Sequence, residues 1–150
     1  MRLLILCTAN SARSQMAEGW ARHYARERGL NLEVHSAGTR ATRVNPHAIE
    51  AMREAGIDLS GHYSKTLYDV PDPWNFDLVL TVCDNAAENC PNYPAATRRL
   101  YHPFPDPAGR PDEAAAFREV RDQIEPVIER LVADLAAGRQ PPGSPSPAPD

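Results

Sequence analysis

The sequence predicts an α/β protein, a three-layer sandwich built on a four-stranded and mostly parallel sheet. Short apolar runs alternate with longer segments in which apolar residues recur every three or four positions, a pattern typical of βαβ units. Two of the apolar runs stop directly at a cysteine, Cys7 and Cys83. Because ligands of parallel sheets bind where the strands end, both cysteines are expected at one functional edge.

Four short segments are expected to be strands. Residues 2–6 are apolar and are followed at once by polar and small residues, which indicates a buried parallel strand. Residues 76–82 form the most apolar later run and are expected at the centre of the sheet. Residues 32–36 and 99–102 supply the remaining two strands.

Three segments show helical periodicity. Residues 14–28 carry one apolar face, and a second helix is expected over 45–56, where Asn45 is a favourable cap. A long amphipathic helix is predicted over 113–137. Pro126 lies inside it, so a kink or a restart of the helix is expected there.

The length of 150 residues predicts a single catalytic domain, residues 1–138, followed by a disordered Pro-rich tail, residues 139–150. No apolar run approaches the ~20 residues of a membrane span, and no signal peptide is recognisable, so a cytoplasmic protein without a membrane partner is expected. The net charge of −4 argues against nucleic acid as a partner. A monomer is the default expectation.

The segment between the first strand and the first helix has the composition of an oxyanion-binding loop. Backbone N–H groups of such a turn and the helix dipole favour a tetrahedral anion, and the guanidinium of Arg13 can hold two of its oxygens. These groups also favour a thiolate, which makes Cys7 a candidate nucleophile with a lowered pKa; a buried strand-end cysteine is the alternative. The expected substrate-binding residues are Thr8, Ala9, Asn10, Ser11, Ala12, Arg13 and Ser14.

Cys83 and Cys90 are separated by six residues, which is not the spacing of a zinc knuckle. Catalytic or redox use is favoured over two inert buried thiols. A helical segment would hold them about 10.5 Å apart, whereas a disulfide needs Cα atoms within about 7 Å, so residues 83–90 are expected to rearrange on oxidation. Asp106, between two prolines, suits a general acid, although a plain turn residue is the alternative.

These motifs resemble the low-molecular-weight tyrosine phosphatase superfamily, which uses Cys-x5-Arg-Ser on this fold. The likeness is closer to its thioredoxin-coupled arsenate reductases and extends over about residues 2–135. The segments that carry it are Cys7 to Trp20, Ser36-Ala37-Gly38, Val44-Asn45-Pro46 with Ala48 to Met52, Val82-Cys83, Asn89-Cys90-Pro91 and Asp106 to Gly109.

The resemblance implies arsenate reduction for arsenic detoxification, without a bound cofactor. Cys7 attacks arsenate while Asp106 protonates the leaving water; Cys83 then attacks Cys7, which releases arsenite and leaves a Cys7–Cys83 disulfide. Cys90 takes over Cys83, and thioredoxin reduces the final Cys83–Cys90 disulfide. Phosphate and sulfate are expected as substrate analogues.

The sequence departs from the pattern of its relatives at three points. Ala9 and Ala12 stand where the family usually has Gly and often a further Cys. Some relatives hold a potassium ion through side chains that match Asn10, Glu18 and Ser36, but the fourth position here is Lys65. We expect the Lys65 ammonium to replace that ion, and we expect no other metal.

Two other functions stay open. A low-molecular-weight protein tyrosine phosphatase needs Cys7, Arg13 and Asp106 but neither of the later cysteines, and weak side phosphatase activity is expected even in a reductase. Ala108 stands where such phosphatases commonly have a tyrosine that contacts phosphotyrosine, which favours the reductase. The second of these functions is that of a non-catalytic regulator that binds an oxyanion or senses redox state.

Overall fold

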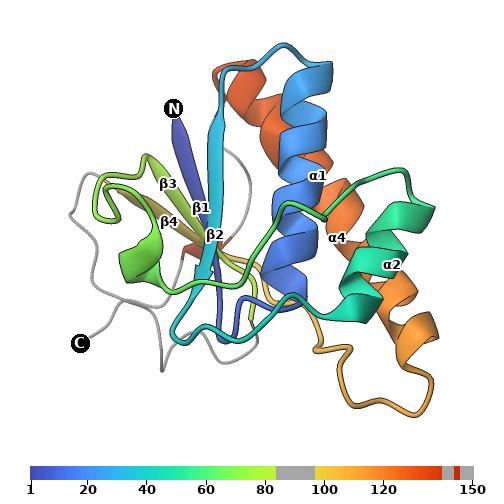
Figure 1. Ribbon diagram of the computed structural model, residues 1–150. Coiled ribbons are helices and arrows are strands. Elements are labelled where there is room, and N and C mark those ends of the chain that lie inside the picture. Colours follow the sequence, from blue (N-terminus) through green and yellow to red (C-terminus); the bar gives the residue numbers. More distant parts are fainter. Residues whose placement is uncertain (84–96, 140–143, 146–150) are drawn as a thin grey trace.

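The computed structural model describes residues 1–83, 97–139 and 144–145 of the chain. Figure 1 shows a central sheet with the longer helices on one side and a short helical turn on the other. The elements are β1 (Arg2–Cys7), α1 (Arg13–Glu27), β2 (Glu33–Gly38), α2 (Pro46–Glu54), the 3-10 turn η1 (Leu67–Asp69), β3 (Leu78–Thr81), β4 (Arg98–Tyr101), α4 (Glu113–Ala136) and β5 (Ser144–Pro145).

The sheet has the strand order β2-β1-β3-β4-β5. The four strands expected from the sequence form its parallel part, with β1 between β2 and β3 and with β4 beyond β3. The two-residue strand β5 pairs antiparallel with β4 and is an addition to the expected sheet. It lies in the segment expected to be a disordered tail; the rest of that tail, from residue 140 on, lies outside the described residues.

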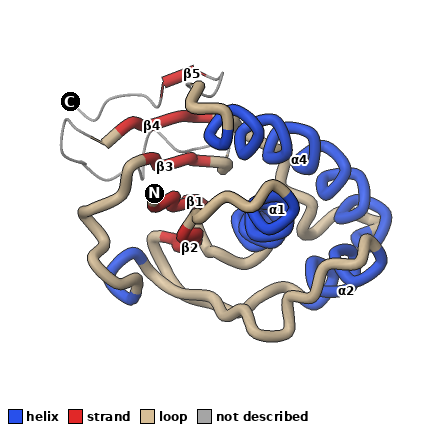
Figure 2. Tube along the Cα trace, turned by 90° about the horizontal axis from the view of Figure 1, so that it is seen from above, coloured by secondary structure: helices blue, strands red, loops and turns tan. Residues whose placement is uncertain are grey.

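The α-helices α1, α2 and α4 cover one face of the sheet, as the view from above shows (Figure 2). The main core lies between these helices and the sheet, and α4 also packs on both α1 and α2. Phe117 of α4 is completely buried there, and burial of one such side chain contributes roughly 2–3 kcal/mol. On the opposite face, Leu67, Val70 and Phe76 from the segment around η1 cover Leu4 and Val79 of the sheet.

The helix α4 runs through Pro126 without a break, so the expected restart does not occur. Ile124 and Ile128 on either side of the proline are fully buried in the same core, and this packing holds the two halves in one helix. No helix within the described ranges is both long and apolar enough to cross a membrane.

The pairing of β1 with β3 brings the two strand-end cysteines to one edge. Leu6 lies opposite Thr81, and the Val82 N–H donates to the Leu6 carbonyl over 2.9 Å. Cys7 and Cys83 therefore leave neighbouring parallel strands side by side. The chain passes from β1 to β2 on one side and β3 lies on the other, so this edge is the switch point at which such sheets bind ligands.

Candidate active site

Neighbouring segments hold the loop between β1 and α1 through hydrogen bonds to its carbonyl groups. The Thr8 carbonyl accepts from the N–H groups of Thr39 and Arg40, the Ala9 carbonyl accepts from the Ser64 hydroxyl, and the Ser11 carbonyl accepts from the Asn45 N–H. Within the described residues, the N–H groups of Ala9, Ser11 and Ala12 donate to no hydrogen bond, so they are left for a ligand. The helix cap Ala12 makes no side-chain hydrogen bond to the first turn of α1, so the helix N-terminus also offers donors to an anion.

Asn10 fixes the turn of this loop. Its φ of 47° lies in the left-handed region, which Asn adopts more readily than most residue types. Its side-chain amide donates to Ser14 Oγ and Ser36 Oγ, both at 2.9 Å, and its Oδ1 accepts from Gln15 Nε2. Gln15 also donates to the Tyr63 carbonyl. The sequence pattern contains Gln15 but does not reveal this supporting role.

Gly38 allows β2 to approach the loop closely. A Cβ atom at this position would lie 2.5 Å from the Thr8 carbonyl oxygen and 2.9 Å from the Asn10 nitrogen. Both neighbours are backbone atoms that cannot move aside without distorting the loop, so a side chain here is excluded.

A cavity of about 430 Å³ opens above the loop. Its walls include most of the expected substrate-binding residues, namely Cys7, Thr8, Ala9, Ser11, Ala12 and Arg13, together with Arg40, Thr42, Asp106 and Ala108. Asn10 and Ser14 were expected to bind substrate, but they lie fully buried behind the loop and support it. Arg40 and Thr42 were missed, because only the folded chain brings their segment to the cavity.

Arg13 links the loop to the segment that carries the expected general acid. Its Nη1 donates to the Phe104 carbonyl at 3.1 Å, and its Nη2 lies 3.8 Å from Asp106 Oδ2. Arg13 is buried, whereas the Asp106 side chain is about half exposed. Asp106 Oδ1 accepts from the Ala108 N–H at 3.0 Å, which holds the carboxylate at the rim of the cavity.

The Cys7 and Cys83 thiols are both buried and lie within hydrogen-bonding contact of each other, and no disulfide joins them. The hydrogen bond with Cys83 raises the pKa of the Cys7 thiol, and burial raises it further, while Arg13 and the Thr8 N–H lower it. The sequence predicted a lowered pKa, which is wrong for this state of the pair. Two thiols in contact compete for one negative charge, so the loop alone does not set the ionisation of Cys7.

Cys90, the third cysteine of the expected relay, lies outside the described residues, as does the segment that was expected to rearrange between it and Cys83.

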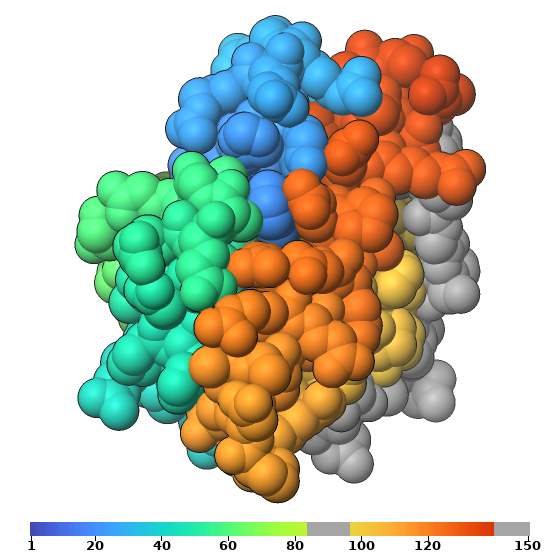
Figure 3. Space-filling model, turned by 90° about the vertical axis from the view of Figure 1, so that its right-hand side faces the viewer, coloured from blue at the N-terminus to red at the C-terminus, as the bar shows by residue number. Residues whose placement is uncertain are grey.

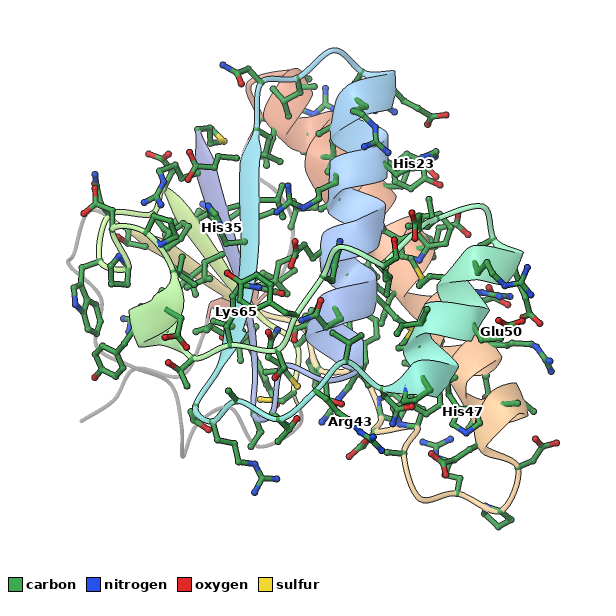
Figure 4. The ribbon with its side chains drawn as sticks, in the orientation of Figure 1. His23, His35, Arg43, His47, Glu50 and Lys65 are labelled. Carbon is green, nitrogen blue, oxygen red and sulfur yellow. The ribbon has the colours of Figure 1, made fainter. Side chains whose placement is uncertain are left out.

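Behind the loop, the residues expected at a cation site are brought together. Ser36 Oγ donates to Glu18 Oε1 at 2.5 Å and accepts from the Asn10 amide. The buried Lys65 places its Nζ 3.9 Å from Glu18 Oε1, and Figure 4 shows it beside β2 and α1. Burial lowers the pKa of Lys65, and the Glu18 carboxylate opposes that effect. The Lys65 ammonium thus lies beside the Glu18 carboxylate of this cluster.

The cluster extends to His62 and Arg22. Arg22 Nε donates to Glu18 Oε2 at 2.8 Å, and His62 Nδ1 lies 2.9 Å from Gln15 Oε1. Burial lowers the pKa of His62, Glu18 opposes the shift, and the positive charges of Arg22 and Lys65 add to it. In the part of the chain that the structure describes, no three His, Cys, Asp or Glu side chains are grouped so as to hold a metal ion.

A strand-end thiol in an oxyanion loop, an arginine that closes the loop and an aspartate across the cavity define a phosphatase-type site. The chain belongs to the low molecular weight phosphotyrosine protein phosphatase family, whose model matches residues 2–141.

Within this family the chain is similar both to proteins named as arsenate reductases and to one named as a phosphatase. It is 46% identical to an arsenate reductase of Staphylococcus aureus (strain bovine RF122 / ET3-1) over 129 residues, which cover 86% of this chain and 94% of that protein. A solved arsenate reductase in the phosphate-binding state is 31% identical with a TM-score of 0.68, covering 89% of this chain and 97% of that one. The YwlE arginine phosphatase with a phosphorylated active-site serine is 29% identical with a TM-score of 0.76, covering 90% and 95%.

Proposed function

We propose that this protein is an arsenate reductase that works through a relay of Cys7, Cys83 and Cys90. The observation that carries the proposal is the contact between the Cys83 and Cys7 thiols at an oxyanion cavity. Hydrolysis of a phosphate ester needs one thiol there, whereas reduction needs a second thiol within reach of the first. The similarity to arsenate reductases at 46% identity supports the same conclusion.

In the first step, the Cys7 thiolate attacks the arsenic of arsenate held by the loop N–H groups and Arg13. A sulfur–arsenic bond forms, and one oxygen leaves as water after it takes a proton from Asp106. The proposed role of Arg13 follows from its place between the loop and the Phe104 carbonyl, which fixes its guanidinium at the cavity.

In the second step, the Cys83 thiolate attacks the Cys7 sulfur. A Cys7–Cys83 bond forms, the sulfur–arsenic bond breaks, and its electron pair stays on arsenic, so that As(V) becomes As(III) and arsenite leaves. Cys90 then attacks Cys83 and releases Cys7 as a thiol. The dithiol of thioredoxin supplies the two electrons that reduce the Cys83–Cys90 disulfide, which fits a cytoplasmic reaction without a bound cofactor.

We also propose that the Lys65 ammonium does the work of a bound cation behind the loop. Its Nζ lies near the Glu18 carboxylate, which in turn holds Ser36 and through it Asn10. Activity is then expected to be the same in potassium and in sodium buffers of equal ionic strength. A steep rise with potassium alone would contradict this role.

A low molecular weight phosphatase is the second candidate, because the family and the loop are shared with such enzymes. The described cavity walls, made largely of Thr, Ala, Ser and Arg, contain no aromatic side chain to contact a phosphotyrosine ring. Weak hydrolysis of aryl phosphates is therefore expected beside the reductase activity.

A coupled assay separates the candidates. Arsenate-dependent consumption of NADPH is measured with thioredoxin and thioredoxin reductase, and hydrolysis of 4-nitrophenyl phosphate is measured in parallel. The wild type is expected to turn over arsenate, whereas Cys83→Ser and Cys90→Ser lose this turnover and keep any phosphatase activity. Sustained arsenate turnover by Cys83→Ser would rule out the relay.

A further inference from the structure

A second cavity lies between β4 and α4 and shares no lining residue with the active-site cavity. Its volume is about 300 Å³, and its apolar walls are Leu80 and Leu100 from the sheet with Val127 and Leu131 from the helix. Figure 3 faces this side of the molecule, where the yellow residues of β4 border the orange α4. The volume is at the lower end of the range for small-molecule sites.

Polar groups from both elements stand beside these apolar walls. Arg130 of α4 is exposed, and within the described ranges its guanidinium forms no ion pair or hydrogen bond. His102, at the end of β4, also lines the cavity, and its buried Nδ1 has no hydrogen-bond partner among the residues that the structure describes. That nitrogen has no accessible surface, so the polar group that the cavity offers to a ligand is the exposed guanidinium of Arg130.

We propose that this cavity binds a small carboxylate with a compact apolar body. The four aliphatic walls, with Tyr101 beside them, fit a ring or a branched chain of that size, and the carboxylate would pair with the exposed Arg130 guanidinium. An uncharged apolar molecule would make no ion pair with Arg130. An inorganic oxyanion would leave the apolar walls empty.

The cavity is connected to the active site by a short path. The His102 ring stacks on Phe104 with centroids 4.7 Å apart, and the Phe104 carbonyl accepts from Arg13 Nη1. A ligand in contact with His102 in the cavity wall therefore acts on Phe104, the residue that positions the active-site guanidinium. Because linkage is reciprocal, an oxyanion in the loop must change the affinity for the carboxylate by the factor with which the carboxylate changes the affinity for the oxyanion.

The test uses 4-methylbenzoate as the probe and 4-methylbenzamide as its uncharged isostere. Titration of the full chain, followed by amide chemical shifts, is expected to give saturable changes at residues 80, 100–102 and 127–131. Arg130→Gln is expected to weaken 4-methylbenzoate about tenfold and to leave 4-methylbenzamide unchanged. Arg118→Gln, on the same helix but away from the cavity, is the matched control and should bind like the wild type.

Two further measurements make the result independent of one variant. Val127→Phe fills the apolar part of the cavity and should weaken both probes. Inorganic phosphate, which we expect to bind in the oxyanion loop, should change the affinity for 4-methylbenzoate; no change would overturn the link through Phe104.

The site itself is overturned if 4-methylbenzoate shows no saturable shifts, if its shifts are confined to residues 7–14, or if Arg130→Gln binds it like the wild type. None of these readouts requires arsenate reduction, so the failure of this site and the failure of the proposed function are separate results.

Discussion

The two segments that face each other across the active-site cavity are built in opposite ways. On one side, the loop after β1 is supported by the fully buried Asn10 and Ser14, which are hydrogen-bonded to each other. On the other side, Asp106 is about half exposed, and its nearest cation, Arg13, is 3.8 Å away. The anion-binding side is preorganised, whereas the acid side has freedom to adjust when a substrate is bound.

Arg13 is the residue that both sides share. It is buried like the loop, and it reaches the Phe104 carbonyl of the opposite segment. Substitutions in the rigid loop, at the exposed acid and at the residues around them are therefore expected to have different effects on catalysis and stability.

The largest effect is expected at Arg13. Arg13→Lys keeps the charge but loses the planar fork that holds two oxygens and the Phe104 carbonyl, so kcat/KM for arsenate should fall by roughly 10³-fold. Steady-state kinetics in the coupled assay measure this change. Arg43→Lys, at an exposed position outside the cavity lining, is the control; equal losses in both variants would contradict the role.

Asp106 should matter for the chemical step more than for binding. Asp106→Asn removes the transferable proton, so kcat should fall by about 10²-fold while the affinity for phosphate as an inhibitor changes little. Asp122→Asn, an exposed position on α4, serves as the control. A loss of phosphate binding equal to the loss of kcat would show that Asp106 holds the loop instead of donating a proton.

Cys83→Ala should make Cys7 more acidic. The hydrogen bond with Cys83 is the largest cause that raises the pKa of Cys7, so its removal lets Arg13 and the Thr8 N–H lower that pKa. Iodoacetamide alkylation of the Cys7 peptide, followed by mass spectrometry across pH, should begin at lower pH than in the wild type. Cys90→Ala is the matched control, and an unchanged profile in Cys83→Ala would mean that the two thiols are not coupled.

Arg40 is exposed at the cavity wall, so it should assist the approach of the anion. Arg40→Ala is expected to raise KM for arsenate about three- to tenfold at low salt with little change in kcat, because exposed charges act through screened attraction. The difference from wild type should shrink as ionic strength increases. A fall in kcat that persists at high salt would place Arg40 in the chemical step.

The smallest effect concerns stability through His62. Burial lowers its pKa in the folded protein below the unfolded value of about 6.5, so the unfolded chain binds the proton more readily. The stability that comes from neutral His62 is complete above about pH 6.5 and is lost as the pH falls toward its folded pKa. Melting temperatures from neutral to mildly acidic pH should fall less steeply in His62→Gln than in the wild type or in His23→Gln.

The sequence predicted the parts of this site that depend on local chemistry. The strand before Cys7 and the helix that begins at Arg13 follow from residue types and spacing along one short segment. The places of Asn10 and Ser14 behind the loop, and of Arg40 in the cavity wall, depend on how distant segments pack.

The pKa of Cys7 and the path of α4 also depend on contacts between distant segments, so the sequence alone did not predict them. The raised pKa of Cys7 requires Cys83, which only the β1–β3 register brings alongside. Pro126 does not interrupt α4, because the core on both sides of it outweighs the local preference of proline.

The most direct test of the proposed function is one turnover of the Cys90→Ser protein with arsenate in the absence of thioredoxin. The relay predicts one equivalent of arsenite and a protein in which peptide mapping finds a Cys7–Cys83 disulfide. Arsenate left unreduced, with both thiols still titratable, would contradict an electron-transfer role for the contact between Cys83 and Cys7.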